Sequence, residues 1–190
     1  MTVCIGIKDK KNHCCYVGAD SGVSHSSFHT KTITPKVFHP YDREDIVIGC
    51  AGSIRMTNLL QTDETMFEGL PENEYLSDDK LILDIIKTVI PKIKEYAETL
   101  KKDDDEFDLI LAVKDKLYRI QSDFSIYEVE EMEIIGSGCE TAYGAMKMAE
   151  SYDPYDNYKS HIQSAISITA EYNYGISTPV NILNTKLVDK

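Results

Sequence analysis

Residues 2–20 read TVCIGIKDKKNHCCYVGAD and predict a β-hairpin that begins with the first residues of the chain. Two apolar, strand-like runs, Val3–Ile7 and Cys14–Asp20, flank the polar stretch Lys8–His13. The segment that follows, Gly22–Pro35, is rich in serine, threonine and histidine and shows little periodicity. The chain is therefore expected to open inside a β-sheet.

Beyond this hairpin, strand-like and helix-like segments follow one another in blocks. Further strands are expected at residues 37–38, 46–51, 107–113, 117–121, near 126, 132–135 and 180–183. Helices are expected from 53 to about 60, from 77 to about 100, from 138 to 150 and from 160 to 172. This order predicts an α+β fold, a four-layer αββα sandwich with helices on both outer faces of two stacked sheets. All 190 residues, 1–190, are expected to form one domain.

The apolar residues of the expected helices recur at three- and four-residue spacing, which is typical of one buried face. The helix starting near 77 has Ser77 as its expected cap and Pro91 as an expected kink. Its expected buried residues are Ile82, Ile85, Ile86, Val89, Ile93, Tyr96, Ala97 and Leu100. The last two helices are expected to bury Ala142, Ala145, Met146, Ala149, Ile162, Ala165, Ile166 and Thr169. The charged run KKDDDE at 101–106 is interpreted as a solvated connector.

Composition excludes several classes of function. The formal net charge of -12 repels phosphate backbones and anionic membrane surfaces, so neither nucleic acid nor a membrane is an expected partner. The amino terminus has no secretory-signal pattern and no window is apolar enough to cross a bilayer, which predicts a cytoplasmic protein. The five cysteines are scattered, with no CxxC pair and no histidine at zinc-finger spacing. Buried, reduced thiols are expected, without metal or cofactor.

Thr2 is the first candidate for chemistry, because it directly follows the initiator methionine. A small residue at position 2 permits methionine removal, which leaves a free α-amine beside a β-hydroxyl. A threonine hydroxyl needs a base at neutral pH, and its own terminal amine, with an unperturbed pKa near ~8, can serve as that base. Thr2 is therefore a candidate amino-terminal nucleophile, provided that Met1 is removed.

Five short stretches occur in an order that resembles the proteasome β-subunit family of the Ntn (amino-terminal-nucleophile) hydrolases. They are Thr2–Ile7, Gly18–Ser21, Thr34–Phe38, Ile48–Ser53 and Ile135–Gly138. The resemblance runs from Thr2 to about Leu183 and is greatest to the bacterial and phage-type members. These include the peptidase subunit of the ATP-dependent two-component protease.

The resemblance implies a role for each of five residues. Thr2 matches the nucleophile, Lys36 the lysine that lowers the pKa of the hydroxyl and amine, and Asp20 the carboxylate that holds this lysine. Gly52 matches the glycine whose N–H binds the oxyanion, which suits a glycine just ahead of a helix start. Ser137 matches the serine that hydrogen-bonds the terminal amine.

Two features of the sequence leave alternatives open. Ser137 and Glu140 also have the spacing of a capping box at a helix start, which would be a structural role. The segment from Glu171 to Gly175 aligns with the family's Asp-x-x-Ser-Gly, but it carries Glu171 for aspartate and Tyr174 for serine. Proton transfer at the amine is therefore less well supported than the nucleophile.

The family alignment places five residues around the first specificity pocket: Val23, Thr34, Phe38, Cys50 and Ile54. Such a pocket would be mostly apolar, and it predicts a hydrophobic residue before the scissile bond. Cys50 has no histidine near it in sequence, so a packing role is expected rather than a nucleophilic one.

These observations predict a threonine-type endopeptidase that cleaves peptides or unfolded proteins inside a homo-oligomeric ring. An ATPase unfoldase partner is implied by the resemblance alone. One alternative is a catalytically inactive, ring-forming scaffold or regulator, favoured by a retained Met1 and by Glu171 and Tyr174. Another is an Ntn amidase that acts on a small-molecule amide.

Overall fold

The computed structural model describes residues 1–25, 28–32, 34–41, 43–70, 78–99, 106–152 and 157–186. Three expectations lie outside these ranges. They are Ser77 as a helix cap, Leu100 as a buried residue and the connector at 101–105.

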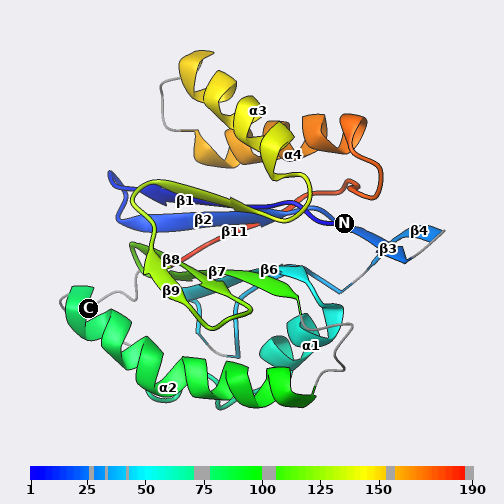
Figure 1. The fold of residues 1–190 in the computed structure, drawn as a ribbon. Coiled ribbons are helices and arrows are strands. Elements are labelled where there is room, and N and C mark those ends of the chain that lie inside the picture. Colours follow the sequence, from blue (N-terminus) through cyan, green and yellow to red (C-terminus); the bar gives the residue numbers. More distant parts are fainter. Residues whose placement is uncertain are drawn as a thin grey trace.

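Two antiparallel sheets form the centre of the molecule (Figure 1). The first has the order β10-β1-β2-β11, with β10 Met132–Ile135, β1 Cys4–Asp9, β2 Cys14–Ala19 and β11 Asn181–Asn184. The second has the order β5-β6-β7-β8-β9, with β5 Val37–Phe38, β6 Ile46–Gly52, β7 Phe107–Val113, β8 Lys116–Gln121 and β9 Ile126–Glu128. Both predicted hairpins, β1–β2 and β7–β8, are confirmed.

Helices cover the outer face of each sheet (Figure 1). α1, Ile54–Thr62, and α2, Asp78–Thr99, lie on the five-stranded sheet, whereas α3, Cys139–Tyr152, and α4, Tyr158–Tyr172, lie on the four-stranded one. Ser53 caps α1 as predicted, because its hydroxyl accepts a hydrogen bond from the Met56 N–H. The predicted four-layer αββα sandwich is thus confirmed.

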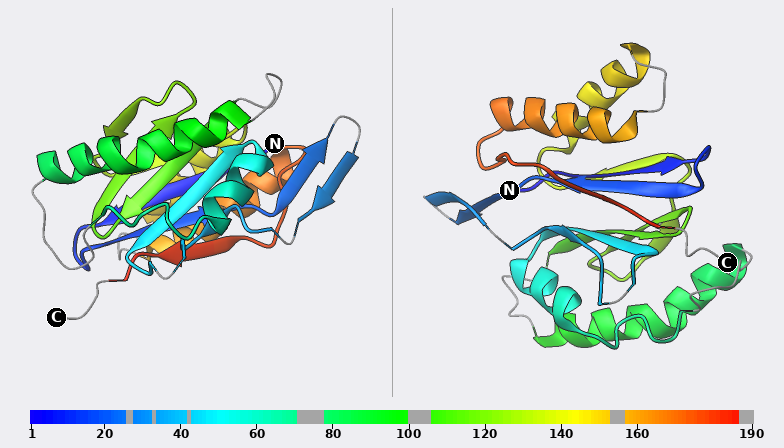
Figure 2. Two further views of the ribbon diagram at one scale, coloured as in Figure 1. Left: turned by 90° about the horizontal axis from the view of Figure 1, so that it is seen from below. Right: turned by 180° about the vertical axis from the view of Figure 1, so that it is seen from behind.

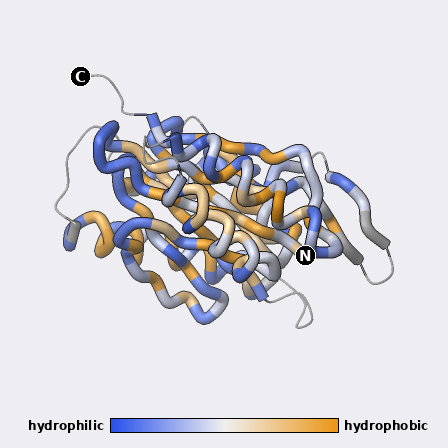
Figure 3. Tube along the Cα trace, turned by 90° about the horizontal axis from the view of Figure 1, so that it is seen from above, coloured by the Kyte–Doolittle hydropathy of each residue, from blue (hydrophilic) through white to orange (hydrophobic). Residues whose placement is uncertain are grey.

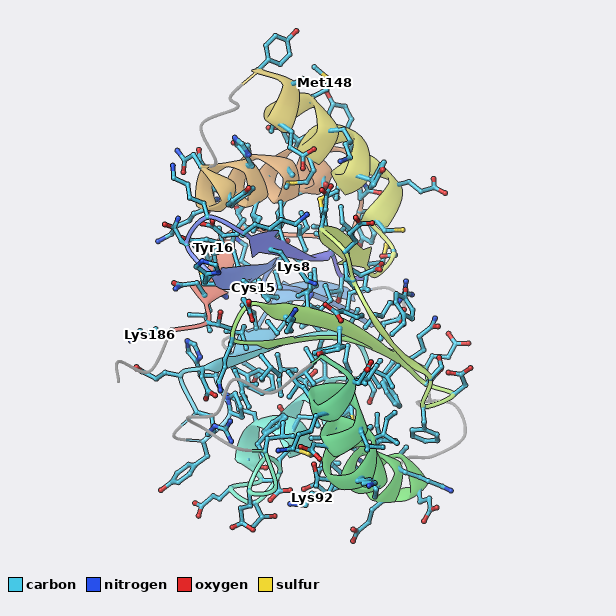
Figure 4. All side chains as sticks on the ribbon, turned by 90° about the vertical axis from the view of Figure 1, so that its left-hand side faces the viewer. Lys8, Cys15, Tyr16, Lys92, Met148 and Lys186 are labelled. Atoms are coloured by element: carbon cyan, nitrogen blue, oxygen red, sulfur yellow. The ribbon has the colours of Figure 1, made fainter. Side chains whose placement is uncertain are left out.

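Three buried clusters hold the four layers together, one at each interface. Strand alternation divides residues between them: Cys15 points into the space between the sheets, while its neighbour Tyr16 packs near Tyr158 of α4 (Figure 4). Figure 3 shows the hydrophobic stretches toward the middle and many hydrophilic ones along the rim. Met148 and Lys92 lie on the outer helical layers at opposite ends of the stack (Figure 4).

The two sheets approach closely where β1 crosses β6. A Cβ atom on Gly49 would lie 2.3 Å from the Cys4 sulfur and 2.9 Å from a Val17 methyl. Any larger residue at position 49 would push the sheets apart. All five cysteines are free thiols, and four of them are buried.

The structure differs from the expectations in three places. Gly22–His25 and Phe28–Lys31 form a two-stranded ribbon, β3–β4, that projects beyond the sandwich (Figure 2). Its polar residues lack the alternation that marks a half-buried strand, so periodicity could not predict it. Ile86 was expected to be buried but is 44% exposed, since it lies at the margin of the apolar face of α2. Ala145 and Ala149, like Ile82, Tyr96 and Ala97 of α2, were expected to be buried but are only half-buried.

In the described ranges, no helix combines the length and the apolar character that a membrane crossing requires.

The α4 interface gives a stability prediction. Ile162 is fully buried, and its side chain packs against Gly18 of β2, whereas Ile168 on the same helix is 42% exposed. We expect Ile162→Ala to lower the free energy of unfolding by about 2–5 kcal/mol, because it leaves a cavity. Ile168→Ala is the matched control and should change it by less than about 0.5 kcal/mol. Urea unfolding followed by circular dichroism measures both, and equal losses would contradict the assigned packing.

Candidate active site

Strand pairing brings three separated segments to one end of the sandwich. Cys4 of β1 pairs with Ala19 of β2 on one side and with Ile135 of β10 on the other. The residues just beyond these pairs, Thr2, Asp20 and Ser137, therefore gather at the same end of the sheet. In Figure 1 the amino terminus lies at this end, next to the β3–β4 ribbon.

Thr2 and Lys36 are in direct contact at the centre of this end. The Lys36 ammonium donates a hydrogen bond of 3.0 Å to the Thr2 hydroxyl and one of 2.8 Å to the Asp20 carboxylate. Thr2 is 8% exposed, Lys36 6% and Asp20 0%. A buried cation beside a hydroxyl favours the deprotonated form of that hydroxyl. The structure thus brings together Thr2, Lys36 and Asp20 as the sequence predicted.

Asp20 holds this arrangement in place through both of its carboxylate oxygens. Oδ1 accepts from the Val3 N–H at 3.1 Å as well as from Lys36. Oδ2 accepts from the Gly22 N–H at 2.7 Å and from the Ser177 N–H at 3.2 Å. Such hydrogen bonds compensate the cost of burying a carboxylate.

Burial lowers the pKa of Lys36, and the neighbouring Asp20 carboxylate opposes that shift. The amine of Met1 lies in the same surroundings. Burial is the largest cause that lowers its pKa, and the positive charge of Lys36 lowers it further. The Met1 amine therefore reaches its neutral, proton-accepting form at a lower pH than an ordinary α-amine.

Ser137 lies in the turn between β10 and α3, and this turn wraps the backbone of Thr2. The Thr2 N–H donates a hydrogen bond of 3.4 Å to the Ser137 hydroxyl, and the Gly138 N–H donates one of 3.2 Å to the Thr2 carbonyl. Gly136 has φ +91°, and a Cβ there would lie 2.3 Å from the Thr2 carbonyl oxygen. Within the described residues, the contact recorded for the Ser137 side chain is with Thr2 and not with the first turn of α3.

Gly52 is the last residue of β6. Its φ of +94° lies in the left-handed region, and a Cβ would meet the Glu106 carbonyl oxygen at 2.3 Å. The residue is exposed and directly precedes the amino terminus of α1, where unpaired N–H groups favour negative charge.

A cavity of about 390 Å³ opens beside Thr2. It is lined by Met1, Thr2, Ala51, Gly52, Glu106, Phe107, Asp108, Gln121, Ser122, Gly136 and Ser137. The sequence did not point to the residues from 106 to 108 or to 121 and 122. They lie at the start of β7 and at the end of β8. Only the pairing of β6 with β7 and of β7 with β8 brings them to Thr2.

None of the five residues expected at the first specificity pocket lines this cavity. Phe38 and Cys50 are 4% and 2% exposed and belong to the core beneath α1 and α2. Burial raises the pKa of the Cys50 thiol to about 12, which leaves it protonated and unreactive at neutral pH. Val23 and Thr34 are half-buried, and Ile54 is 39% exposed.

The two residues that depart from the family pattern do not line this cavity. Glu171 is exposed, and Tyr174 is 66% exposed. Among the described residues, no group of three or more histidine, cysteine, aspartate or glutamate side chains is arranged to hold a metal ion.

The four-layer αββα sandwich, with Thr2 just ahead of β1, is the Ntn hydrolase fold. Among solved structures, BPH from Thiobacillus denitrificans has a TM-score of 0.71 at 20% identity, with full coverage of both chains. The eukaryotic HslV from Trypanosoma brucei has a TM-score of 0.68 at 19% identity and covers 96% of this chain and 98% of its own. Anbu, an ancestral β-subunit from Yersinia bercovieri, has 0.72 at 15% identity, covering 96% and 81%.

At these identities the likeness establishes a shared fold. No protein-family model matches the sequence, and no curated protein matches it significantly.

The Asp20–Lys36 pair gives a second prediction. We expect Lys36→Met to lower the free energy of unfolding by about 3–5 kcal/mol, because Asp20 then remains as a buried charge without its cation. The double variant with Asp20→Asn should lose less than the sum of the two single changes. Lys10→Met is the control: its partner Glu131 lies 3.3 Å away, but both side chains are about two-thirds exposed, so no measurable change is expected. A strictly additive urea-unfolding cycle would contradict this coupling.

Proposed function

We propose that this protein is a threonine-type peptidase in which Thr2, freed by removal of Met1, attacks the peptide bond. The observation that carries the proposal is the 3.0 Å contact between the Thr2 hydroxyl and the buried Lys36 ammonium, at the edge of a substrate-sized cavity. The fold shared with HslV and with the ancestral β-subunit Anbu supports it.

The proposed reaction begins with proton transfer from the Thr2 hydroxyl to the free Thr2 amine. Oγ1 then bonds to the carbonyl carbon of the substrate, and the Gly52 N–H stabilises the oxyanion. When the carbon–nitrogen bond breaks, the Thr2 ammonium returns its proton to the leaving nitrogen. Water, activated by the same amine, finally hydrolyses the ester on Thr2 and regenerates the hydroxyl.

Lys36 and Ser137 position these groups in the proposed reaction. Lys36 keeps a positive charge beside Oγ1 and lowers the pKa of both the hydroxyl and the amine. Ser137 accepts a hydrogen bond from the Thr2 nitrogen and so orients the lone pair of the future amine. While Met1 remains attached, this nitrogen is a peptide N–H and cannot act as a base.

The acyl half of the substrate is proposed to lie on the Lys36 side. Val23, Thr34 and Ile54 keep exposed surface and remain our proposal for the first specificity pocket, with a preference for a hydrophobic residue. Phe38 and Cys50 contribute buried packing instead. Assembly into a homo-oligomeric ring and delivery of substrate by an ATPase unfoldase are proposed from the family resemblance.

A non-catalytic scaffold is the second candidate function. Glu171 and Tyr174 favour it, because they stand where the family pattern has an aspartate and a serine, and both are exposed. The state of Met1 in the native protein separates the two candidates.

The first test is therefore the intact mass of the purified native protein, combined with peptide hydrolysis. The peptidase proposal expects a mass lower by one methionine. It also expects Thr2→Ala to abolish hydrolysis, while Thr2→Ser, which keeps a hydroxyl and an amine, retains part of it. A retained Met1 together with no hydrolysis by the wild-type protein would favour the scaffold, whereas full activity of Thr2→Ala would overturn Thr2 as the nucleophile.

The pH dependence of the reaction tests the role of the amine. Burial and the positive charge of Lys36 lower the pKa of the Met1 amine. We expect the same two causes to lower the pKa of the Thr2 amine below the ordinary value of about 8 once Met1 is removed. We expect kcat/KM to rise with pH and to reach its plateau before pH 8, because only the neutral amine accepts the hydroxyl proton. A rise centred above pH 8 would contradict the lowered pKa that we expect for the Thr2 amine.

A further inference from the structure

The charged side chains among the residues that line the cavity beside Thr2 are all acidic. Two carboxylate residues, Glu106 and Asp108, are among the residues that line it, and none of those residues is a lysine or arginine. The neutral polar residues Gln121 and Ser122 complete this wall. A cavity of about 390 Å³ lies within the usual range of ligand pockets, roughly 300–1,000 Å³.

The position of Ser137 shows which half of a substrate would enter this cavity. In the proposed reaction, the leaving nitrogen must take its proton from the Thr2 amine. The Thr2 nitrogen faces Ser137, and Ser137 and Gly136 form a wall of the cavity. The residues that follow the scissile bond therefore lie on this side, away from Lys36.

The two carboxylates differ in how far their charge is already compensated. Asp108 accepts hydrogen bonds of 3.1 Å on both oxygens from the Arg119 guanidinium, which also bonds Glu133 of β10 at 3.1 Å. One guanidinium thus serves two carboxylates, and a net negative charge remains. Glu106 is exposed, and its carboxylate makes no hydrogen bond or ion pair with another described residue. Its charge is therefore available to a ligand.

Building on the proposed peptidase function, we propose that this cavity binds the substrate residues after the scissile bond and that Glu106 selects a lysine or arginine there. Asp108 supports the selection, because Arg119 compensates its charge only in part. Glu106 acts as a specificity-determining residue, and it takes no part in the proton transfers at Thr2.

The test uses the full chain and quenched fluorescent peptides that differ only at the first two positions after the scissile bond. Lysine or arginine there should give a kcat/KM about two- to fivefold above glutamate, the factor expected for one partly screened charge pair. Glu106→Gln should remove most of this ratio, and Glu106→Lys should reverse it. The control Glu95→Lys makes the same charge change on exposed α2 and should leave the ratio unchanged.

A second measurement does not depend on catalysis. The leaving half is released with a free amino terminus, so the amidated dipeptides Lys-Lys and Glu-Glu serve as probes in titration calorimetry with Thr2→Ala. We expect the lysine probe to bind more tightly and to lose this advantage in the double variant with Glu106→Gln. Calorimetry on the wild-type protein shows whether the Thr2 change itself alters the cavity.

The outcomes separate the two proposals. Thr2-dependent cleavage with equal kcat/KM for lysine and glutamate would overturn the selection by Glu106 and leave the peptidase function intact. Glu106-dependent binding of the lysine probe without peptide cleavage would overturn the peptidase function and support the cationic subsite. If the protein neither cleaves the peptides nor binds the lysine probe selectively, both proposals are overturned.

Discussion

The buried contact between Asp20 and Lys36 is the constraint on which this end of the molecule depends. Asp20 is fully buried, and it joins the start of β1 through Val3, the start of β3 through Gly22 and the segment after α4 through Ser177. Lys36 provides the compensating charge. A carboxylate in this position is tolerated only because every one of these donors is in place, so the fold and the site stabilise each other.

The close approach of the two sheets positions the remaining groups of the site. Gly49 lets β6 pass directly beneath β1, and Gly52 then ends β6 next to Thr2. Arg119 on the five-stranded sheet reaches Glu133 on the four-stranded one, which ties the two sheets together beside the cavity. The nucleophile candidate comes from one sheet and much of the cavity wall from the other, so the site forms only when the sheets stack.

Some parts of the site could be predicted from the sequence, and others could not. Thr2, Asp20, Lys36 and Ser137 were predicted because each lies in a short stretch that resembles a known family, and the structure brings all four together. Phe38 and Cys50 were expected at a substrate pocket, but strand alternation turns them into the core. Glu106 carries no local signal, because a single exposed glutamate before a strand has no motif.

Apart from β3 and β4, periodicity and spacing along the chain were enough to predict the order of strands and helices, because most elements bury one face whose repeat is visible locally. The same sequence marked Thr2 as a candidate nucleophile through its position and its hydroxyl. Only the tertiary structure decided which side chains share the cavity, since contacts between β6, β7 and β8 depend on strand register and sheet stacking. The β3–β4 ribbon likewise forms by pairing between backbones, which leaves no alternation of apolar and polar residues in the sequence.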